Sequence, residues 1–152
     1  MSGTERVRIE KQHSPAYKAL VAMSVEADRA AEVAGIDPLL VELVRIRTSQ
    51  LNGCAFCLRM HTGDALKKGE TAERLAVLPA WRETGYFSGT ERAALRLAEA
   101  VTLVSDGQVS DEVYDAVAAV LTAEQISAVA WLVIALNAFN RVAITGRYPV
   151  HP

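Results

Sequence analysis

Two cysteines and a histidine occur at helical spacing in the segment LNGCAFCLRMH, which reads Cys54-x-x-Cys57-x-x-x-His61. Because an α-helix has about 3.6 residues per turn, steps of three and four residues place both sulfurs and the imidazole on one face. The thiolate is the reactive form of cysteine, and both a helix N-terminus and a neighbouring imidazole favour it. The second sulfur can then resolve what the first has formed. The spacing therefore predicts a dithiol/disulfide cycle.

Glu42 is a second candidate, because it precedes this segment by one predicted helix and lies among Val41, Leu43 and Val44. A carboxylate in apolar surroundings is expected to have a partner. If the two helices fold back antiparallel across Asn52-Gly53, Glu42 and His61 could meet. A carboxylate bonded to one imidazole nitrogen would then orient the ring for proton transfer.

The elements that must position these residues are all predicted to be helices. Ser14-Pro15 and Asp37-Pro38 are start signals, Gly35 and Gly69 are stop signals, and residues 88–91 and 122–125 have capping-box spacing. We expect helices at about residues 14–33, 39–50, 54–68, 71–84, 88–105, 110–121 and 122–143. Only residues 7–9 suggest a strand. These signals predict an all-α bundle of six to seven helices, forming a single domain over residues 1–152, with the cysteine pair at the start of a helix.

The last predicted helix is apolar on every side over residues 128–136. Such a helix must lie at the centre of the core or be covered by another subunit. We therefore expect a homo-oligomer.

Composition limits the classes of function. The net charge of −2 and the scattered basic residues give no positive field for a phosphate backbone, so no nucleic-acid partner is expected. The charged N-terminal segment, residues 1–10, does not resemble a signal peptide, and no later run reaches the roughly 18 apolar residues of a spanning helix. We expect a cytoplasmic protein with no membrane association. In a reducing compartment, two cysteines favour redox or metal chemistry over a structural disulfide.

Other interpretations of the site remain. The cysteines could be buried apolar residues, or the triad could hold zinc in a regulatory interaction module, with Glu42, Asp64 or another chain as fourth ligand. A haem attachment site is excluded because Leu58, not histidine, follows Cys57. A silent oligomeric binder with a vestigial site is the third possibility. No site role is assigned to His13, His151, Asn137, Asn140 or Arg141.

The array of Glu42, eleven intervening residues and Cys54-x-x-Cys57-x-x-x-His61 resembles the active-site pattern of the alkylhydroperoxidase D-like proteins, within the carboxymuconolactone decarboxylase-like superfamily. The closing ALNAFNRVAITGRYP, residues 135–149, is similar to the last helix of that family. The resemblance implies an all-helical fold, obligate trimers or hexamers, and reduction of hydroperoxides, with an external dithiol as reductant and no bound cofactor.

The resemblance also implies roles for individual residues. Cys57 is similar to the peroxide-attacking sulfur, Cys54 to the resolving sulfur, and Glu42 and His61 to members of a proton relay. In the best characterised branch a further relay histidine precedes the second cysteine, where this chain has Phe56. A decarboxylase-like relative without peroxidase activity is the remaining family alternative, although the decarboxylase branch lacks the cysteine pair that this chain retains.

Overall fold

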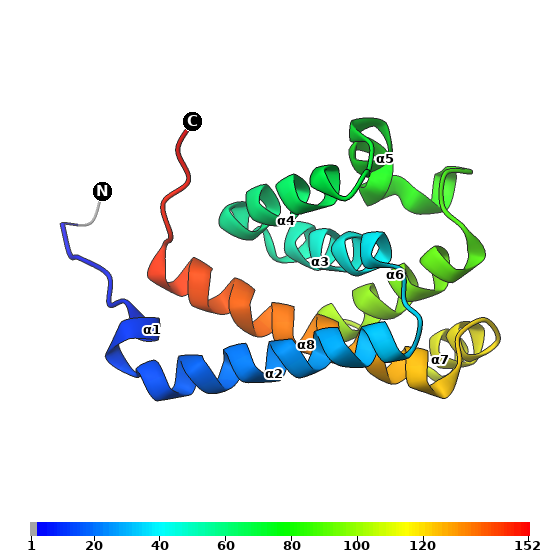
Figure 1. Ribbon diagram of the computed structural model, residues 1–152, viewed down its shortest axis with the longest axis horizontal. Helices are drawn as coiled ribbons and strands as arrows, with labels where there is room; N and C mark the ends of the chain where they lie inside the picture. The colour runs from blue at the N-terminus through cyan, green and yellow to red at the C-terminus, as the bar shows by residue number, and fades with distance from the viewer. Residues whose placement is uncertain (1–2) are drawn as a thin grey trace.

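The computed structural model describes residues 3–152 and is helical throughout the elements it contains (Figure 1). The all-α fold class is therefore confirmed. Residues 1 and 2, which belong to the predicted domain and to the charged N-terminal segment, lie outside the described residues. The elements in chain order are α1 (Ile9–Gln12), α2 (Ser14–Val33), α3 (Pro38–Asn52), α4 (Ala55–Lys67), α5 (Ala72–Val77), the 3₁₀-helix η1 (Leu78–Glu83), α6 (Gly89–Thr102), α7 (Asp111–Ala118) and α8 (Ala123–Gly146).

The predicted start signals work as caps in the structure. Asp37 accepts a hydrogen bond from the Leu39 amide at 2.7 Å at the start of α3. Ser88 and Thr122 each form the reciprocal capping box that their spacing indicates. Each cap satisfies amides that the first turn of a helix leaves without partners. Local sequence therefore accounts for where these three helices begin.

Helix α8 is the central element of the bundle. It packs against α2, α3, α4, α6 and α7, and Figure 1 shows it alongside α2 below the α3–α4 pair. Its buried side chains join those of α3 and α6 in the main core, which includes Leu43, Ile46, Leu95, Leu97, Val129, Leu132 and Val133. The core thus holds α3 firmly against α8, and α3 carries Glu42.

Among the described residues, α8 is also the one helix long and apolar enough to span a membrane by length and composition, contrary to the expectation from sequence. Its buried side chains pack against α2, α3 and α6 in the core of the bundle. On its outer side, Trp131 and Ile134 remain 47% and 43% exposed in the single chain. One chain therefore covers only part of the apolar surface that the sequence predicts on all sides of α8.

Two expectations about secondary structure were wrong. Residues 7–9 do not form a strand; Ile9 instead begins the single-turn helix α1, because a three-residue alternation with no neighbouring strand cannot pair. The single helix expected over residues 71–84 breaks after Val77 into η1. Pro79 lacks the amide that would continue the α-helical hydrogen bonds, and Ala80 leaves the helical region at φ −110° and ψ 30°. These two additions explain why the described residues contain more than six to seven helices.

Candidate active site

The cysteine pair lies at the junction of α3 and α4. Gly53 ends α3 in the left-handed conformation at φ 68°, which turns the chain sharply and starts α4 beside α3. Cys54 is the N-cap of α4, and its sulfur accepts a hydrogen bond from the Cys57 amide at 3.4 Å. The two sulfurs form a disulfide, and both residues are buried, at 1% and 3% exposure. The pair therefore has the spacing and position that a redox cycle needs.

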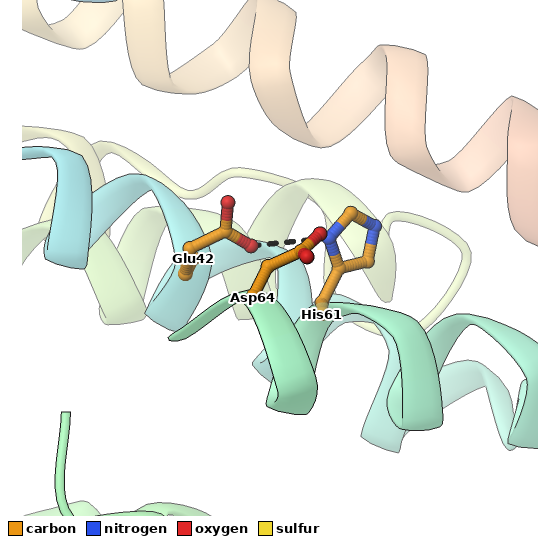
Figure 2. Close-up of side chains that lie close together, drawn as sticks. All are labelled: Glu42, His61 and Asp64. Atoms are coloured by element: carbon orange, nitrogen blue, oxygen red, sulfur yellow. Dashed lines mark hydrogen bonds and ion pairs between the residues drawn. The ribbon is translucent and has the colours of Figure 1, made fainter. Parts of the chain in front are cut away.

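Glu42 of α3 and His61 of α4 meet in the core. The His61 ring nitrogen Nδ1 lies 3.1 Å from the Glu42 oxygen Oε2, and Figure 2 shows the carboxylate directed at the ring. Both residues are buried, at 2% and 7% exposure. The structure thus brings together the two relay candidates that the sequence placed on adjacent antiparallel helices.

Two cations that sequence reasoning missed bind the other oxygen of Glu42. The Lys68 ammonium donates to Oε1 at 2.7 Å, and an Arg45 guanidinium nitrogen lies 3.4 Å from the same atom. Burial alone would raise the pKa of the Glu42 carboxyl, but hydrogen bonds from His61 and Lys68 and the charge of Arg45 together lower this pKa to about 2. Glu42 is therefore a carboxylate at neutral pH. Lys68 follows the last residue of α4, where the sequence indicated only a favourable contact with the helix dipole.

The charge of Glu42 fixes the proton arrangement on His61. A carboxylate only accepts hydrogen bonds, so Nδ1 of His61 must carry the proton that it shares with Glu42. In the neutral ring, Nε2 is then the atom with a free lone pair. Figure 2 shows this second nitrogen on the side of the ring away from Glu42. The pair thus presents an oriented proton acceptor.

A cavity of about 410 Å³ opens beside this acceptor. Cys57 and His61 both line it, and most of its remaining wall is apolar, from Tyr17, Phe56, Met60, Leu132, Ala135, Leu136, Phe139, Val142, Ala143 and Tyr148. Cys54 is absent from this lining. The disulfide thus presents Cys57, and not Cys54, to the cavity that contains the imidazole.

Cys54 instead lines a separate surface groove of about 310 Å³, next to Arg6, Ala55, Ile144 and Arg147. Phe56 and Tyr148 line both hollows and pack edge to face, with ring centroids 5.1 Å apart. This aromatic pair separates the approaches to the two sulfurs. The sequence identified Phe56 as a departure from the family pattern but gave no signal for Tyr148, which follows α8 and meets α4 only through the fold.

Comparison with known proteins places this site in a family. The sequence profile of the carboxymuconolactone decarboxylase family matches residues 15–100, which include Glu42, Cys54, Cys57 and His61. The chain belongs to this family. A protein of Bacillus subtilis named YdfG, which is uncharacterised, is 39% identical over 120 residues, covering 79% of this chain and 82% of that protein.

Two further relatives extend the comparison. The uncharacterised Escherichia coli protein YnjA is 31% identical over 68 residues, covering 45% of this chain and 37% of that protein. A crystal structure from Agrobacterium tumefaciens, described as a protein of unknown function and provisionally as the antioxidant defence protein AhpD, superposes with a TM-score of 0.84. The two sequences are 27% identical, and the superposition covers 97% of this chain and 100% of the Agrobacterium chain. The alkylhydroperoxidase D-like family and fold predicted from sequence are therefore confirmed.

The protein also has three neighbouring side chains whose oxygen and nitrogen atoms could bind a metal ion. Ligand atoms of Glu42, His61 and Asp64 all lie within 4.8 Å of one another, and Figure 2 shows the three side chains side by side. Neither cysteine belongs to the group, and their two sulfurs are bonded to each other. Lys68 and Arg45 already neutralise Glu42, so a further cation there would be repelled. The zinc site imagined from Cys54, Cys57 and His61 would require the disulfide to be reduced.

The asparagines of α8 stabilise the site from behind. Asn140 is fully buried and donates to the Ser49 hydroxyl at 3.1 Å, while Asn52 donates to both Asn137 and Asn140 at 2.9 Å. These bonds tie the end of α3 to α8, immediately before the turn that places Cys54. Asn137 and Asn140 thus join α8 to α3 through hydrogen bonds.

Proposed function

We propose that this protein is a cofactor-free thiol peroxidase that reduces organic hydroperoxides through the Cys54–Cys57 pair. The observation that carries the proposal is that Cys57 shares a cavity with His61, whose Nδ1 is held by the Glu42 carboxylate. The remaining nitrogen, Nε2, can then take the thiol proton of Cys57. Family membership and the likeness to the Agrobacterium structure support an antioxidant role.

The reaction follows from these positions. In the reduced protein, His61 Nε2 accepts the Cys57 proton, and the thiolate attacks the terminal hydroperoxide oxygen, so that the O–O bond breaks. The departing alkoxide takes a proton to become an alcohol, and Cys57 becomes a sulfenic acid. The Cys54 thiol then attacks the Cys57 sulfur, which forms the disulfide and releases water. One hydroperoxide and two thiols thus give one alcohol, one water and one disulfide.

The shape and chemistry of the cavity support an organic substrate. Its volume of about 410 Å³ is in the range of small-molecule sites, and aliphatic and aromatic side chains supply most of its wall. Transfer of an alkyl group from water to such a wall is favourable, at about 25 cal/mol per Å² of buried apolar surface. Hydrogen peroxide has no apolar surface to bury. The cavity therefore favours hydroperoxides that carry an alkyl or aryl group.

Regeneration in this proposal needs an external dithiol and no bound cofactor. A reducing compartment such as the cytoplasm supplies dithiols and would keep the pair in cycle, so we propose a cytoplasmic location. No membrane or nucleic-acid partner takes part in the proposed cycle.

The decisive experiment is a thiol titration before and after treatment with cumene hydroperoxide. We expect reduced protein to lose two thiols per chain and to gain one internal disulfide. C57S should abolish peroxide consumption, whereas C54S should stop after one turnover with a sulfenic acid on Cys57. Unchanged thiols in the wild-type protein would refute the proposal. Stoichiometric zinc in the same sample, bound only by reduced thiols, would instead favour the metal-binding module.

We further propose that the protein is a homo-oligomer, for which the family resemblance suggests a trimer or hexamer. Trp131 and Ile134 lie one turn apart on the exposed side of α8, where a second copy could cover them. Sedimentation of the wild-type chain and of W131E tests this arrangement. We expect the wild type to sediment as an oligomer and W131E to shift towards the monomer, whereas a monomeric wild type would refute it.

A further inference from the structure

The wall of the cavity beside Cys57 carries a second sulfur, the thioether of Met60. Met60 follows Cys57 by one helical turn on α4 and directly precedes His61, and all three side chains line the cavity. Met60 is 46% exposed. Among the described residues that line the cavity it is the one methionine, because Met23 of α2 is half-buried and lies outside that lining. A molecule bound beside Cys57 can therefore also contact Met60.

The cavity is open while the cysteine pair is oxidised. With the Cys54–Cys57 bond formed, the cavity has its volume of about 410 Å³ and Cys57 is part of its wall. A sulfur in a disulfide is no thiolate and cannot attack a hydroperoxide. Until the pair is reduced, a hydroperoxide in the cavity faces the Met60 thioether instead. Thioethers are themselves oxidised, to methionine sulfoxide.

The surroundings of Met60 favour this oxidation. Cleavage of the O–O bond produces an alkoxide that needs a proton, and the neighbouring His61 has Nδ1 bound to Glu42, so that its Nε2 can carry one. The apolar wall also holds an organic hydroperoxide next to the thioether, which raises its effective concentration there. Met23 has neither advantage, since it lies outside the cavity.

We infer that Met60 is a modification site, at which a hydroperoxide bound to the oxidised protein converts the thioether to a sulfoxide and thereby weakens further binding of organic hydroperoxides. This inference rests on the proposed function, because it takes the hydroperoxide as the molecule that occupies the cavity. In the reduced protein the Cys57 thiolate reacts first. The sulfoxide therefore accumulates only when hydroperoxide is supplied faster than the external dithiol.

The reaction needs no further reactant. The Met60 sulfur attacks the terminal oxygen of the hydroperoxide, so that an S–O bond forms and the O–O bond breaks. The proton on that oxygen passes to the departing alkoxide, and His61 Nε2 can relay it. The sulfur loses two electrons and the hydroperoxide gains two. One hydroperoxide and one thioether thus give one alcohol and one sulfoxide, which enzymatic reduction of methionine sulfoxide reverses.

The sulfoxide changes the chemistry of the cavity wall. The oxygen that it adds is polar, and an alkyl or aryl group placed against it removes the water that solvates this oxygen. The free energy gained by burying the organic group is then partly lost. Binding of organic hydroperoxides and of the alcohols formed from them should therefore weaken together.

The test compares two oxidants on full-length protein whose cysteine pair has been oxidised with diamide. Mass spectrometry of its peptides follows the sulfoxides of Met60 and Met23 during treatment with cumene hydroperoxide or with hydrogen peroxide. Hydrogen peroxide has no apolar part, so its Met60-to-Met23 rate ratio reflects exposure alone. We expect this ratio to be about tenfold higher with cumene hydroperoxide, because the cavity concentrates that oxidant at Met60.

Cumyl alcohol, the product of cumene hydroperoxide, serves as the competitor in the same experiment. An excess of it should fill the cavity and bring the ratio down to the value found with hydrogen peroxide. Equal ratios for the two oxidants, or a high ratio that the alcohol does not lower, would overturn the inference.

The effect on binding is measured with the same alcohol. Calorimetry gives its Kd for the oxidised protein before and after treatment with cumene hydroperoxide, and we expect this Kd to rise about fivefold. M23L is the matched control and should show the same rise, whereas M60L should keep the Kd of its own untreated sample. An unchanged Kd in wild-type protein with Met60 fully oxidised, or an equal rise in M60L, would overturn the inferred effect.

These measurements are independent of the peroxidase test, because diamide and not a hydroperoxide supplies the disulfide. A protein whose thiols react with cumene hydroperoxide, but whose ratio is the same for both oxidants, would overturn the inference alone. Selective oxidation of Met60 in a protein whose thiols do not react would refute the proposed function and leave the modification site in place.

Discussion

Two carboxylates, the buried Glu42 and the partly buried Glu99, have similar hydrogen-bonding and ionic partners but play different roles. Glu42 binds Lys68, Arg45 and His61; Glu99 binds Arg82 at 2.6 Å, Trp81 at 2.8 Å and Arg47 at 2.9 Å. In each, burial alone would raise the pKa of the carboxyl, and the hydrogen-bond donors and cations outweigh it and lower this pKa.

The difference between them lies in the partners. Tryptophan and arginine do not exchange protons near neutral pH, so the Glu99 cluster can only join η1 and α6 to α3. The Glu42 cluster contains an imidazole, and that imidazole lines a cavity together with a cysteine. A lowered pKa alone therefore does not show that a carboxylate takes part in catalysis. Only a partner that can exchange a proton near neutral pH, such as His61, gives it a role in proton transfer.

The largest expected effect separates the two carboxylates by activity. In E42Q, Lys68 and Arg45 still need the remaining oxygen, so the amide nitrogen would face His61 and donate to Nδ1. The proton of the ring then moves to Nε2, which can no longer act as the base. We expect the rate of thiol oxidation by cumene hydroperoxide to fall on the order of a thousandfold in E42Q, by analogy with loss of the orienting carboxylate in catalytic triads.

E99Q is the matched control for this prediction, since it replaces the same residue type in the cluster without an imidazole. Its oxidation rate should stay within about twofold of wild type when it is folded. Stopped-flow measurement of thiol loss compares the three proteins at pH 7. Similar losses in E42Q and E99Q would mean that Glu42 acts through stability and not through His61.

Acid pH should weaken the Glu42 cluster in a defined window. The pKa of Glu42 is about 2 in the folded protein and near its ordinary value of 4.5 when unfolded. The unfolded state therefore binds more protons as the pH falls, and a contribution that is complete above about pH 5 is progressively lost towards pH 2. Its full size is at most about 3 kcal/mol, at 1.36 kcal/mol per pKa unit.

Urea unfolding of wild type and E42Q between pH 6 and pH 3 measures this contribution, a range chosen to lie inside that window. The difference between their free energies of unfolding should shrink as the pH falls, because the variant has no carboxyl to titrate at this position. A constant difference across the range would contradict the lowered pKa.

E99Q should instead lower the free energy of unfolding. The amide keeps one acceptor oxygen for Trp81, Arg47 and Arg82, so at least one of these donors loses its acceptor. We expect a loss of about 2 kcal/mol in the free energy of unfolding, in the range for hydrogen bonds to charged groups. Calorimetry at pH 7 should record a fall of roughly 4–8 °C in Tm for a chain of this length. An unchanged Tm would show that the cluster adds nothing to the joint between α6, η1 and α3.

The same contrast explains what sequence could predict. Helical spacing placed Cys54, Cys57 and His61 on one face, and the glycine turn at Gly53 brought Glu42 to His61, because each step depends on local backbone geometry. Cap signals located the starts of α3, α6 and α8 for the same reason.

Contacts between distant segments could not be derived in this way. Lys68 reaches Glu42 from the end of α4, and Tyr148 reaches Phe56 only because α8 ends beside α4. Neither arrangement has a period or a motif. The division of the two sulfurs between two hollows likewise depends on tertiary packing, and it became visible only in the structure.

The smallest expected effect concerns Lys68, whose side chain is 42% exposed and whose ion pair is therefore screened by water. In K68M the apolar stem is kept, Arg45 still neutralises Glu42, and His61 keeps its acceptor. We expect the oxidation rate at pH 7 to fall only about two- to fivefold, in line with the 0.2–1 kcal/mol of exposed ion pairs. K67M is the control, because Lys67 lies next to it on α4 and makes no contact with Glu42 in the described residues. If K68M lost as much activity as E42Q, Lys68 and not Arg45 would be the partner that holds Glu42 in place for His61.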